Sequence, residues 1–355
     1  MIASTMERVA SPSSEVRSSV IRCGLIADVQ FADRPNKVKE TCIYSYHESL
    51  SRLRRAIQAF DAAEDVHVAI SLGDLIEGTK EEQLARPPLV PDEGTVEGPT
   101  MTDLRTVTAV LRESGVEWRH CVGNHECCLP RDALYHELNI EDSVSDDGCL
   151  YYHWSVGRWR FIVLDTYDVS SIAWPEDNAH YREALVLQAE RGLGTDPEVQ
   201  CVPSQKASGA CSNITYWNGG IGAEQLLWLR RTLDDVRVQR QAALVFGHTP
   251  LLAEAGDVAG RYHAYNGGEV GKVLAGGPAV AYICGHFHEG GYHQDVDGVH
   301  HVTIEGAVQA EGPQCHAILE VDADPWSGGA ALRIDGVGVT SYKLELRRVA
   351  AGSRE

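Results

Sequence analysis

Short apolar runs alternate with amphipathic stretches along most of the chain. The short runs suit buried β-strands, whereas Leu50, Leu53, Ile57 and Phe60 recur at helical spacing, with polar residues such as Arg52 between them. The pattern predicts strands at 20–29, 66–72, 116–122, 159–164, 242–246, 280–284, 301–304, 316–321 and 331–346, and helices at about 44–60, 101–114 and 222–237. Strands that alternate with helices in this way predict an α/β layered fold.

The same pattern predicts a single domain over residues 20–346. Residues 1–19 are polar and rich in serine, so we expect a disordered N-terminal tail there and a second short tail at 347–355. Residues 79–100 are charged and rich in proline and glycine, and residues 166–220 are punctuated by the same two residues. Both segments are expected to be insertions, the second of them draped over a functional site.

Charge and composition narrow the classes of partner. The formal net charge of −20 disfavours nucleic acid, because an acidic surface repels phosphate backbones, but it leaves room for a small anionic substrate bound through metal cations. The chain has no run of eighteen apolar residues, so we expect no membrane partner. Its ten scattered cysteines are expected to be reduced thiols. We therefore expect a cytoplasmic location, with organelle targeting by the N-terminal tail as the alternative.

Polar side chains that bind metals elsewhere in proteins follow five of the predicted strands. Open α/β sheets place their ligand sites at these carboxyl ends of strands. After the strand at 280–284, Gly285 is expected to permit a tight turn, and the alternation of a strand end is expected to put His286 and His288 on one face. The full set is Asp28, Gln30, Asp74, Asn124, His125, His248, His286 and His288.

This set contains carboxylates, amide oxygens and imidazoles but no thiolate. Such donors suit octahedral ions such as Mn or Fe better than a cysteine-rich zinc site would. Even without His125, the other seven side chains exceed the needs of one ion and suit two ions about 3.5–4 Å apart, bridged by one carboxylate. Each segment alone has a simpler interpretation as a strand-to-turn junction, but that interpretation does not explain five such segments in this order.

The order Asp-x-Gln, Gly-Asp, Gly-Asn-His-Glu, Gly-His and Gly-His-x-His resembles the calcineurin-like metallophosphoesterase superfamily, from about Cys23 to about Leu346. The resemblance implies a four-layer α/β (α+β) sandwich, with two mixed β-sheets face to face and helices outside. It also implies a binuclear centre in which Asp74 bridges two ions. One ion would take Asp28, Gln30, Asp74 and His288, and the other would take Asp74, Asn124, His248 and His286.

Two positions depart from the superfamily pattern. Gln30 stands where the superfamily usually has histidine, and Glu77 stands where it has the second aspartate of Gly-Asp-x-x-Asp. A neutral amide oxygen is a harder donor than imidazole, which shifts the metal preference from Zn or Fe towards Mn or Mg. We therefore expect two Mn(II) ions, with Mg, Fe and Zn as alternatives.

Longer segments resemble a narrower branch, the Mn-dependent ADP-ribose/CDP-alcohol diphosphatases. They are Asp28-Val29-Gln30-Phe31-Ala32-Asp33, Leu164-Asp165-Thr166-Tyr167-Asp168, Asn218-Gly219-Gly220-Ile221-Gly222 and Gly285-His286-Phe287-His288-Glu289-Gly290-Gly291-Tyr292. The resemblance implies hydrolysis of the diphosphate in conjugates such as ADP-ribose and CDP-choline, which releases a nucleoside monophosphate. The nucleophile would be a hydroxide held by the two ions, since metal binding lowers the pKa of water.

Further residues receive candidate roles on the same basis. His125, oriented by Glu77, is expected to donate a proton or a hydrogen bond to the leaving oxygen, with structural packing on the metal loop as its alternative. Phe31 would stack on a nucleobase or form a wall of the pocket, with core packing as its alternative. Tyr292 and His293 would line the substrate end of the site.

Two other functions stay open on the sequence alone. A different phosphoesterase would act on cyclic nucleotides or phosphoproteins, but Gln30 and the Gly-Gly-Tyr292 segment argue against it. A non-catalytic interaction module on the same fold would be expected to have lost ligands, whereas every ligand position of this chain carries a metal-binding residue.

Overall fold

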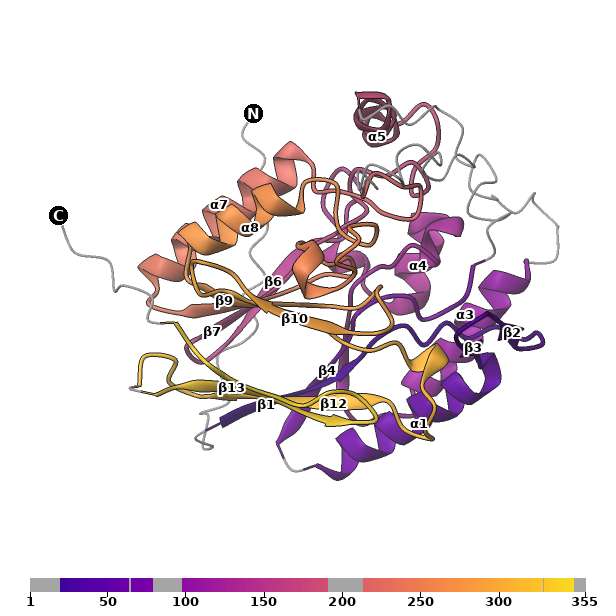
Figure 1. Ribbon diagram of the computed structural model, residues 1–355, viewed down its shortest axis with the longest axis horizontal. Coiled ribbons are helices and arrows are strands. Elements are labelled where there is room, and N and C mark those ends of the chain that lie inside the picture. The colour runs from indigo at the N-terminus through magenta and orange to yellow at the C-terminus, as the bar shows by residue number, and fades with distance from the viewer. Residues whose placement is uncertain (1–19, 64, 79–97, 191–212, 328, 348–355) are drawn as a thin grey trace.

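Two six-stranded β-sheets lie face to face in the computed structural model, which describes residues 20–63, 65–78, 98–190, 213–327 and 329–347 (Figure 1). The first sheet has the order β14-β13-β12-β1-β4-β5, and the second has the order β10-β11-β9-β8-β7-β6. Each sheet combines parallel and antiparallel pairs, which confirms the expected mixed sheets. The strands are β1 Val20–Ile26, β4 Val66–Ser71, β5 Glu117–His120, β6 Tyr152–Val156, β7 Trp159–Val163, β8 Ala242–Phe246, β9 Ala279–Cys284, β10 Gly291–Gln294, β11 His300–Thr303, β12 His316–Asp322, β13 Ala331–Val337 and β14 Tyr342–Glu345.

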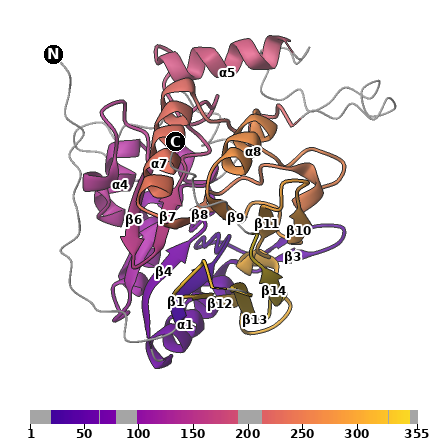
Figure 2. The ribbon, with the colours of Figure 1, turned by 90° about the vertical axis from the view of Figure 1, so that its left-hand side faces the viewer.

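Helices cover the outer face of each sheet and complete the four layers of the expected α/β sandwich (Figures 1 and 2). Helices α1 and α3 lie against the first sheet, and α7 and α8 lie against the second. The helices are α1 Tyr46–Ala62, α3 Pro99–Leu111, α4 Arg131–Leu138, α5 Ala179–Glu190, α7 Ala223–Val238 and α8 Gly267–Gly276, and a short hairpin is formed by β2 Lys37–Val38 and β3 Ile43–Tyr44.

Three apolar cores hold these layers together. Leu25 and Leu244 belong to the core between the two sheets. Phe60 of α1 belongs to the core under the first sheet, and Leu229 of α7 and Leu274 of α8 belong to the core over the second. Because the sheets are packed on one another, the ends of their central strands are held in a fixed relative position.

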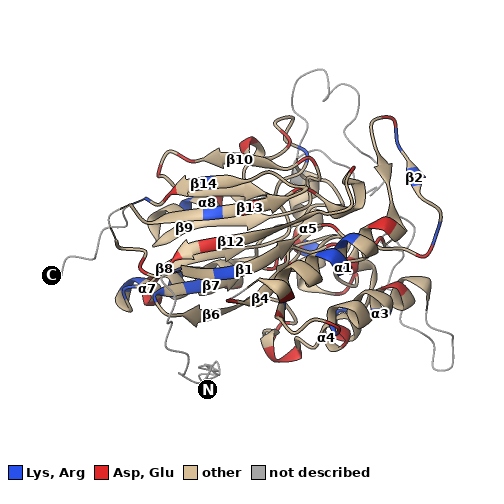
Figure 3. Ribbon diagram, turned by 90° about the horizontal axis from the view of Figure 1, so that it is seen from below, with Lys and Arg blue, Asp and Glu red and all other residues tan. Residues whose placement is uncertain are grey.

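A ladder of opposite charges crosses the first sheet. Arg22 on β1 and Arg333 on β13 each lie 2.8 Å from a carboxylate oxygen of Glu320 on β12, the strand between them. Figure 3 shows charged segments of alternating sign side by side on β1, β12 and β13. Opposite charges on neighbouring strands support the strand register, which in turn fixes where β1 ends.

The predicted elements are confirmed with shifted boundaries. The strand predicted over 20–29 ends at Ile26, and the helix predicted from residue 101 begins at Pro99. The pattern missed α4, α5, α8, β6 and β10, and the single strand predicted over 331–346 is two strands, β13 and β14. The elements α4, β6 and β10 are short, α5 lies inside the segment interpreted as an insertion, and α8 is rich in glycine. Arg347, assigned to the C-terminal tail, instead donates hydrogen bonds to the carbonyl oxygens of Ala279 and Gly277.

Several expectations fall on segments outside the described residues. These segments are most of the two predicted tails, at 1–19 and 348–355, and most of the first insertion and the middle of the second, at 79–97 and 191–212. The eight cysteines in the described part of the chain are free thiols. None of the described helices combines the length and the apolar character needed to cross a membrane.

Candidate metal centre

The carboxyl ends of strands from both sheets meet at one edge of the sandwich. All seven predicted metal ligands lie in the loops that follow these strands. The first sheet supplies Asp28 and Gln30 after β1, Asp74 after β4 and Asn124 after β5, and the second supplies His248 after β8 and His286 and His288 after β9. Segments separated by more than two hundred residues thus converge on one site.

The backbone that presents these side chains is left-handed rather than extended. Asp28, Gln30, Asp74 and His286 have φ values of 50°, 43°, 54° and 71°, a region that non-glycine residues rarely adopt. We expected strand alternation to place Asp28 with Gln30, and His286 with His288. These residues do lie near one another, but strand alternation is not the cause. The strands end before these residues, and a local reversal of the backbone aims the side chains at the centre.

The glycine before His286 is required by a close approach rather than by its own conformation. A Cβ atom added at Gly285 would lie 2.5 Å from Asp28 Oδ2, well inside van der Waals contact. Gly285 is not among the residues of positive φ, whereas His286 is. Gly285 therefore lets the β9 loop pass against the Asp28 carboxylate.

Asp74 lies at the middle of the first group of contacts. Its Oδ2 atom lies 3.2 Å from His248 Nε2, which lies 3.1 Å from His286 Nδ1. One ligand atom from each of these residues lies within 4.8 Å of the other two. This spacing suits three donors around a single ion.

A second group of contacts adjoins the first through Asp74. His288 Nε2 lies 3.2 Å from Asp28 Oδ1, and Gln30 Nε2 lies 3.3 Å from Asp74 Oδ2. The loop that carries Asn124 is tied to the same carboxylate, because the next backbone N–H donates to Asp74 Oδ1 at 2.9 Å. Asp74 thus contacts both groups, as expected of a bridging ligand.

Each of the three ligand histidines has an oxygen partner on its outer ring nitrogen. His248 Nδ1 lies 2.7 Å from the Leu72 carbonyl oxygen, and His286 Nε2 lies 2.8 Å from Asn218 Oδ1. His288 Nδ1 lies 3.3 Å from Gln309 Oε1. An outer N–H that donates to oxygen leaves the inner nitrogen unprotonated, which is the form that binds a metal.

Burial and charge oppose each other at the centre. Burial raises the pKa of the Asp74 carboxyl, but the His248 and His125 imidazoles outweigh this effect and hold that pKa below its ordinary value. Burial lowers the pKa of His248, but Asp74 outweighs it and raises that pKa to about 9. The space between Asp74 and His248 therefore attracts positive charge, which a divalent cation supplies.

Gln30 provides an independent test of fit for such a cation. Its side chain is 1% exposed, and its Oε1 atom has no hydrogen-bond partner among the described residues. A buried polar atom without a partner is destabilising by about 1–3 kcal/mol unless something binds it. An amide oxygen on a side chain that contacts the Asp74 carboxylate is a ligand that Mn²⁺ or Mg²⁺ would satisfy, so the residues fit the expected ions.

Replacing Gln30 with histidine is expected to move the metal preference away from manganese. Imidazole is the softer donor, so the ratio of Zn²⁺ to Mn²⁺ affinity should rise by about tenfold or more. Competitive metal titration of the purified variants measures this ratio. Gln58→His, on the exposed side of α1, is the matched control and should leave the ratio unchanged. An equal ratio in Gln30→His and wild type would contradict the argument from donor hardness.

Glu126 organises the loops that carry Asp74 and Asn124, a role that the sequence did not reveal. Its carboxylate accepts the backbone N–H groups of Gly123 at 2.8 Å, Asp74 at 2.9 Å and Leu75 at 2.5 Å. The side chain is buried, and burial together with the nearby Asp74 raises its pKa to about 7. Glu126 therefore holds the ends of β4 and β5 in a single arrangement.

Removal of this carboxylate is expected to destabilise the fold strongly. Glu126→Ala leaves three buried N–H groups without acceptors, so the free energy of unfolding should fall by at least about 3 kcal/mol. Urea denaturation measures the change. Glu113→Ala, which breaks an exposed ion pair with Arg54, is the control and should change stability by less than about 1 kcal/mol. Similar losses in both variants would show that Glu126 does not hold the loops.

His125 lies next to the centre, and contacts on its Nδ1 side fix the orientation of its ring. Its Nδ1 atom lies 2.9 Å from the Gly78 carbonyl oxygen and 3.7 Å from Glu77 Oε2. The Gly78 carbonyl therefore orients the ring, and Glu77 acts through its charge from beyond hydrogen-bond distance. Burial lowers the pKa of His125, but Glu77 and Asp74 outweigh it and raise that pKa, which favours the protonated form that a donor needs.

The predicted substrate residues do not gather at the centre. Phe31 is 4% exposed and belongs to the core under the first sheet, so core packing accounts for it. Tyr292 lies on β10, where its ring packs on Tyr342 and its hydroxyl lies 3.0 Å from His300 Nδ1. Its neighbour His293 points to the opposite face of that edge strand. Within the described residues, no hydrogen bond or ring contact joins these three side chains to a candidate ligand.

Other residues take the places next to the ligands. Tyr167 donates its hydroxyl to Asn124 Oδ1 at 3.3 Å, and Asn218 contacts His286. Both lie near the ends of the predicted 166–220 insertion, so the two ends of that segment reach the centre. Tyr262 lies with its ring 5.5 Å from that of His286 and 6.0 Å from that of Trp217. The longer family-like segments contain Tyr167 and Asn218, whereas no pattern singled out Tyr262.

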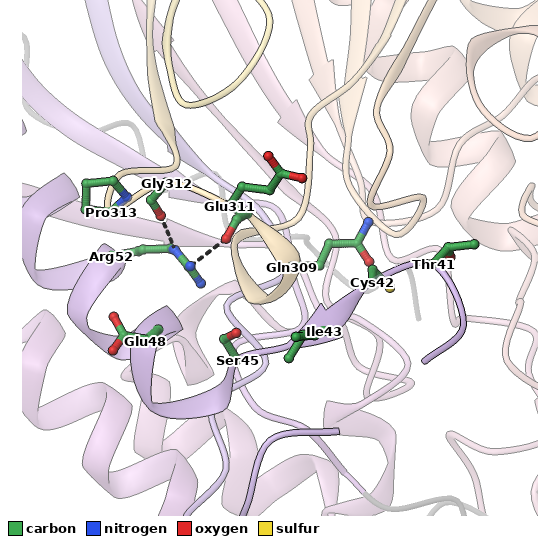
Figure 4. A pocket seen from close by; sticks show the side chains of 11 residues that line it. Thr41, Cys42, Ile43, Ser45, Glu48, Arg52, Gln309, Glu311, Gly312 and Pro313 are labelled. Atoms are coloured by element: carbon green, nitrogen blue, oxygen red, sulfur yellow. Dashed lines mark hydrogen bonds between the residues drawn. The ribbon is translucent and has the colours of Figure 1, made fainter. Parts of the chain in front are cut away.

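A pocket of about 740 Å³ lies beside the His288 side of the centre, between the start of α1 and the loop around Gln309 (Figure 4). Arg52 forms part of its wall and is 4% exposed, although the helical pattern placed it among polar positions. Its guanidinium donates to the carbonyl oxygens of Ala307 at 2.9 Å and Gly312 at 2.8 Å. Arg52 therefore supports the loop behind His288.

Known proteins are similar to this chain over most of its length. A family model described as calcineurin-like phosphoesterase matches residues 21–290. The chain is 31% identical to a manganese-dependent ADP-ribose/CDP-alcohol diphosphatase of Oryza sativa subsp. japonica, over 87% of this chain and 90% of that protein. A protein of the same name from Arabidopsis thaliana is 30% identical, over 83% of this chain and 89% of its own length. A solved dimetal phosphatase from Danio rerio covers 93% of this chain and 100% of its own, with a TM-score of 0.79 at 25% identity. The chain therefore belongs to the calcineurin-like phosphoesterase family, as its motifs predicted.

Proposed function

We propose that this protein hydrolyses the diphosphate of nucleoside diphosphate conjugates, such as ADP-ribose and CDP-alcohols, to release a nucleoside monophosphate. The observation that carries the proposal is the buried nitrogen and oxygen donor set around Asp74, in which Gln30 offers an amide oxygen that no other described residue binds. The relatives from rice and Arabidopsis, which match over nearly their full length, carry the name of that activity. The expected cytoplasmic location and the absence of a nucleic-acid partner stay predictions.

Two manganese ions are proposed to occupy the centre. Asp28, Gln30 and His288 would hold one ion, Asn124, His248 and His286 would hold the other, and Asp74 would contact both. When bound, the ions supply positive charge to the diphosphate oxygens and lower the pKa of water. The left-handed backbone at Asp28 and Asp74 keeps their carboxylates pointing inward, so little reorganisation is needed for binding.

The chain's own residues would act on the two ends of the substrate. His125 presents Nε2 towards the centre, 3.9 Å from Asp74 Oδ2, and in its protonated form would donate to the leaving oxygen. Tyr262, Trp217 and Phe287 are partly exposed aromatic residues, and Tyr262 is packed between the other two, beside His286. Such rings suit a nucleobase, which stacks on aromatic faces.

A substrate panel tests the proposal. The purified chain, reconstituted with Mn²⁺, is expected to hydrolyse ADP-ribose and CDP-choline and to leave a cyclic nucleotide and a phosphopeptide almost unchanged. Metal content is measured on the same samples. Turnover of only the cyclic nucleotide or the phosphopeptide would assign the chain to another phosphoesterase class. No turnover of any compound with metal bound would show a non-catalytic module.

A further inference from the structure

A second group of metal-binding side chains lies in a different part of the molecule. Asp147 and Cys149 come from the turn before β6, and His180 comes from the first turn of α5. One ligand atom from each of these three lies within 4.8 Å of the other two. The group shares no residue with the centre around Asp74, and it contains the thiol that the centre lacks.

Cys149 is placed as a metal ligand would be. Its side chain is 0% exposed, and its Sγ atom lies 3.4 Å from Asp168 Oδ1. A cysteine binds a metal as the thiolate, so a cation at this position would replace the thiol proton.

His180 is oriented by a carboxylate behind it. Its Nδ1 atom lies 2.8 Å from Asp168 Oδ1, which leaves Nε2 facing Asp147 Oδ2 at 3.9 Å. Asp168 is itself fixed, because its Oδ2 accepts the Gly222 backbone N–H and the Gln225 side-chain amide, each at 2.8 Å. A carboxylate behind a histidine is the usual outer partner of a zinc-binding imidazole.

Trp174 restricts the same ring from one side. The indole is stacked on His180 with the ring centroids 4.9 Å apart and an interplanar angle of 21°. Its Nε1 atom donates to the Asp168 carbonyl oxygen at 2.7 Å. The His180 ring is therefore held in place by two neighbours, Asp168 at its edge and Trp174 on its face, before any ion binds.

We propose that Cys149 Sγ, His180 Nε2 and the Asp147 carboxylate bind a thiophilic divalent cation of the zinc type, with water as the fourth ligand. Thiolate, imidazole and carboxylate together match zinc rather than manganese. In a tetrahedral zinc site the donor atoms lie about 3.3–3.7 Å apart, close to the 3.9 Å between His180 and Asp147. The ion links α5 to the turn before β6 and so anchors one end of the 166–220 segment.

Cobalt(II) distinguishes this site from the manganese centre. A Co²⁺–thiolate bond produces a near-ultraviolet charge-transfer band, and the predicted manganese centre contains no cysteine. The full chain, with its centre filled by excess Mn²⁺, is titrated with Co²⁺, and bound Co²⁺ is then displaced by Zn²⁺. Wild type is expected to show the band at one ion per chain and to lose it on addition of Zn²⁺.

Variants test the assigned ligands. Cys149→Ser is expected to lack the band, and His180→Ala, at a position that is only 20% exposed, should bind Co²⁺ at least about 10–100-fold more weakly. Cys42→Ser and His136→Ala change residues of the same types outside the group and should keep the band and its affinity. Absence of the band in wild type would overturn the proposal, as would an unchanged band in Cys149→Ser. If Cys149→Ser does not fold, unchanged Co²⁺ affinity in His180→Ala overturns it.

Discussion

Asp74→Ala is expected to abolish metal binding and hydrolysis together. Asp74 contacts Gln30 on one side and His248 on the other, so its removal disconnects both groups of ligands. The proposed chemistry depends on charge supplied by the ions, so kcat/KM should fall by more than about 1,000-fold. Metal content by mass spectrometry and hydrolysis of ADP-ribose are measured on the same folded sample.

The control for this variant is Asp33→Ala, which removes an 83% exposed carboxylate on the loop after β1. It should retain both bound metal and activity. If Asp74→Ala kept two ions per chain, the bridging role of Asp74 would be wrong. If it lost the ions and kept its activity, the centre would not be the site of hydrolysis.

His125→Ala is expected to lose activity while it keeps its metal. The ring is oriented by the Gly78 carbonyl and is no predicted ligand, but its Nε2 atom faces the centre. Loss of a positioned proton donor typically lowers kcat by about 10²–10⁴-fold. Substrate affinity and metal content should stay near their wild-type values.

Asn124→Ala provides the contrast at the adjacent position. This variant removes a predicted ligand and should therefore bind less metal, and part of its activity should return at high Mn²⁺. The activity of His125→Ala should not rise with added Mn²⁺, because this variant lacks the proton donor rather than a metal ligand. Full kcat in His125→Ala would leave only a structural role for that histidine.

The positions of the ligands could be predicted because they depend on local features. Each ligand follows an apolar run directly, and parallel strands bring such positions to one edge of a sheet. The sequence therefore identified Asp74 and His248 as neighbours although 174 positions separate them. The alternation of strands and helices predicts only an α/β layered fold, and the family resemblance implies the mixed sheets and the four layers.

The remaining features depend on contacts that no local pattern contains. The hydrogen bond between Asn218 and His286 joins residues 68 positions apart, and Tyr262 reaches His286 from a loop without a motif. Arg52 looks like any polar residue of an amphipathic helix, and only the carbonyl groups of the Gln309 loop explain its burial. Phe31 lies one residue from a ligand, but its side chain leaves the site for the core.

The left-handed backbone at Asp28, Gln30, Asp74 and His286 has a consequence for how inactive variants behave in a cell. Each non-glycine residue in this conformation is destabilising by about 1 kcal/mol or more. A glycine at one of these positions relieves that strain while it removes a ligand. The free energy of unfolding should therefore fall little, whereas the rate of hydrolysis should fall strongly. Cellular abundance follows folding stability rather than turnover. Such a variant is expected to accumulate to nearly normal levels, and a hydrolysis assay, rather than a protein blot, would reveal the defect.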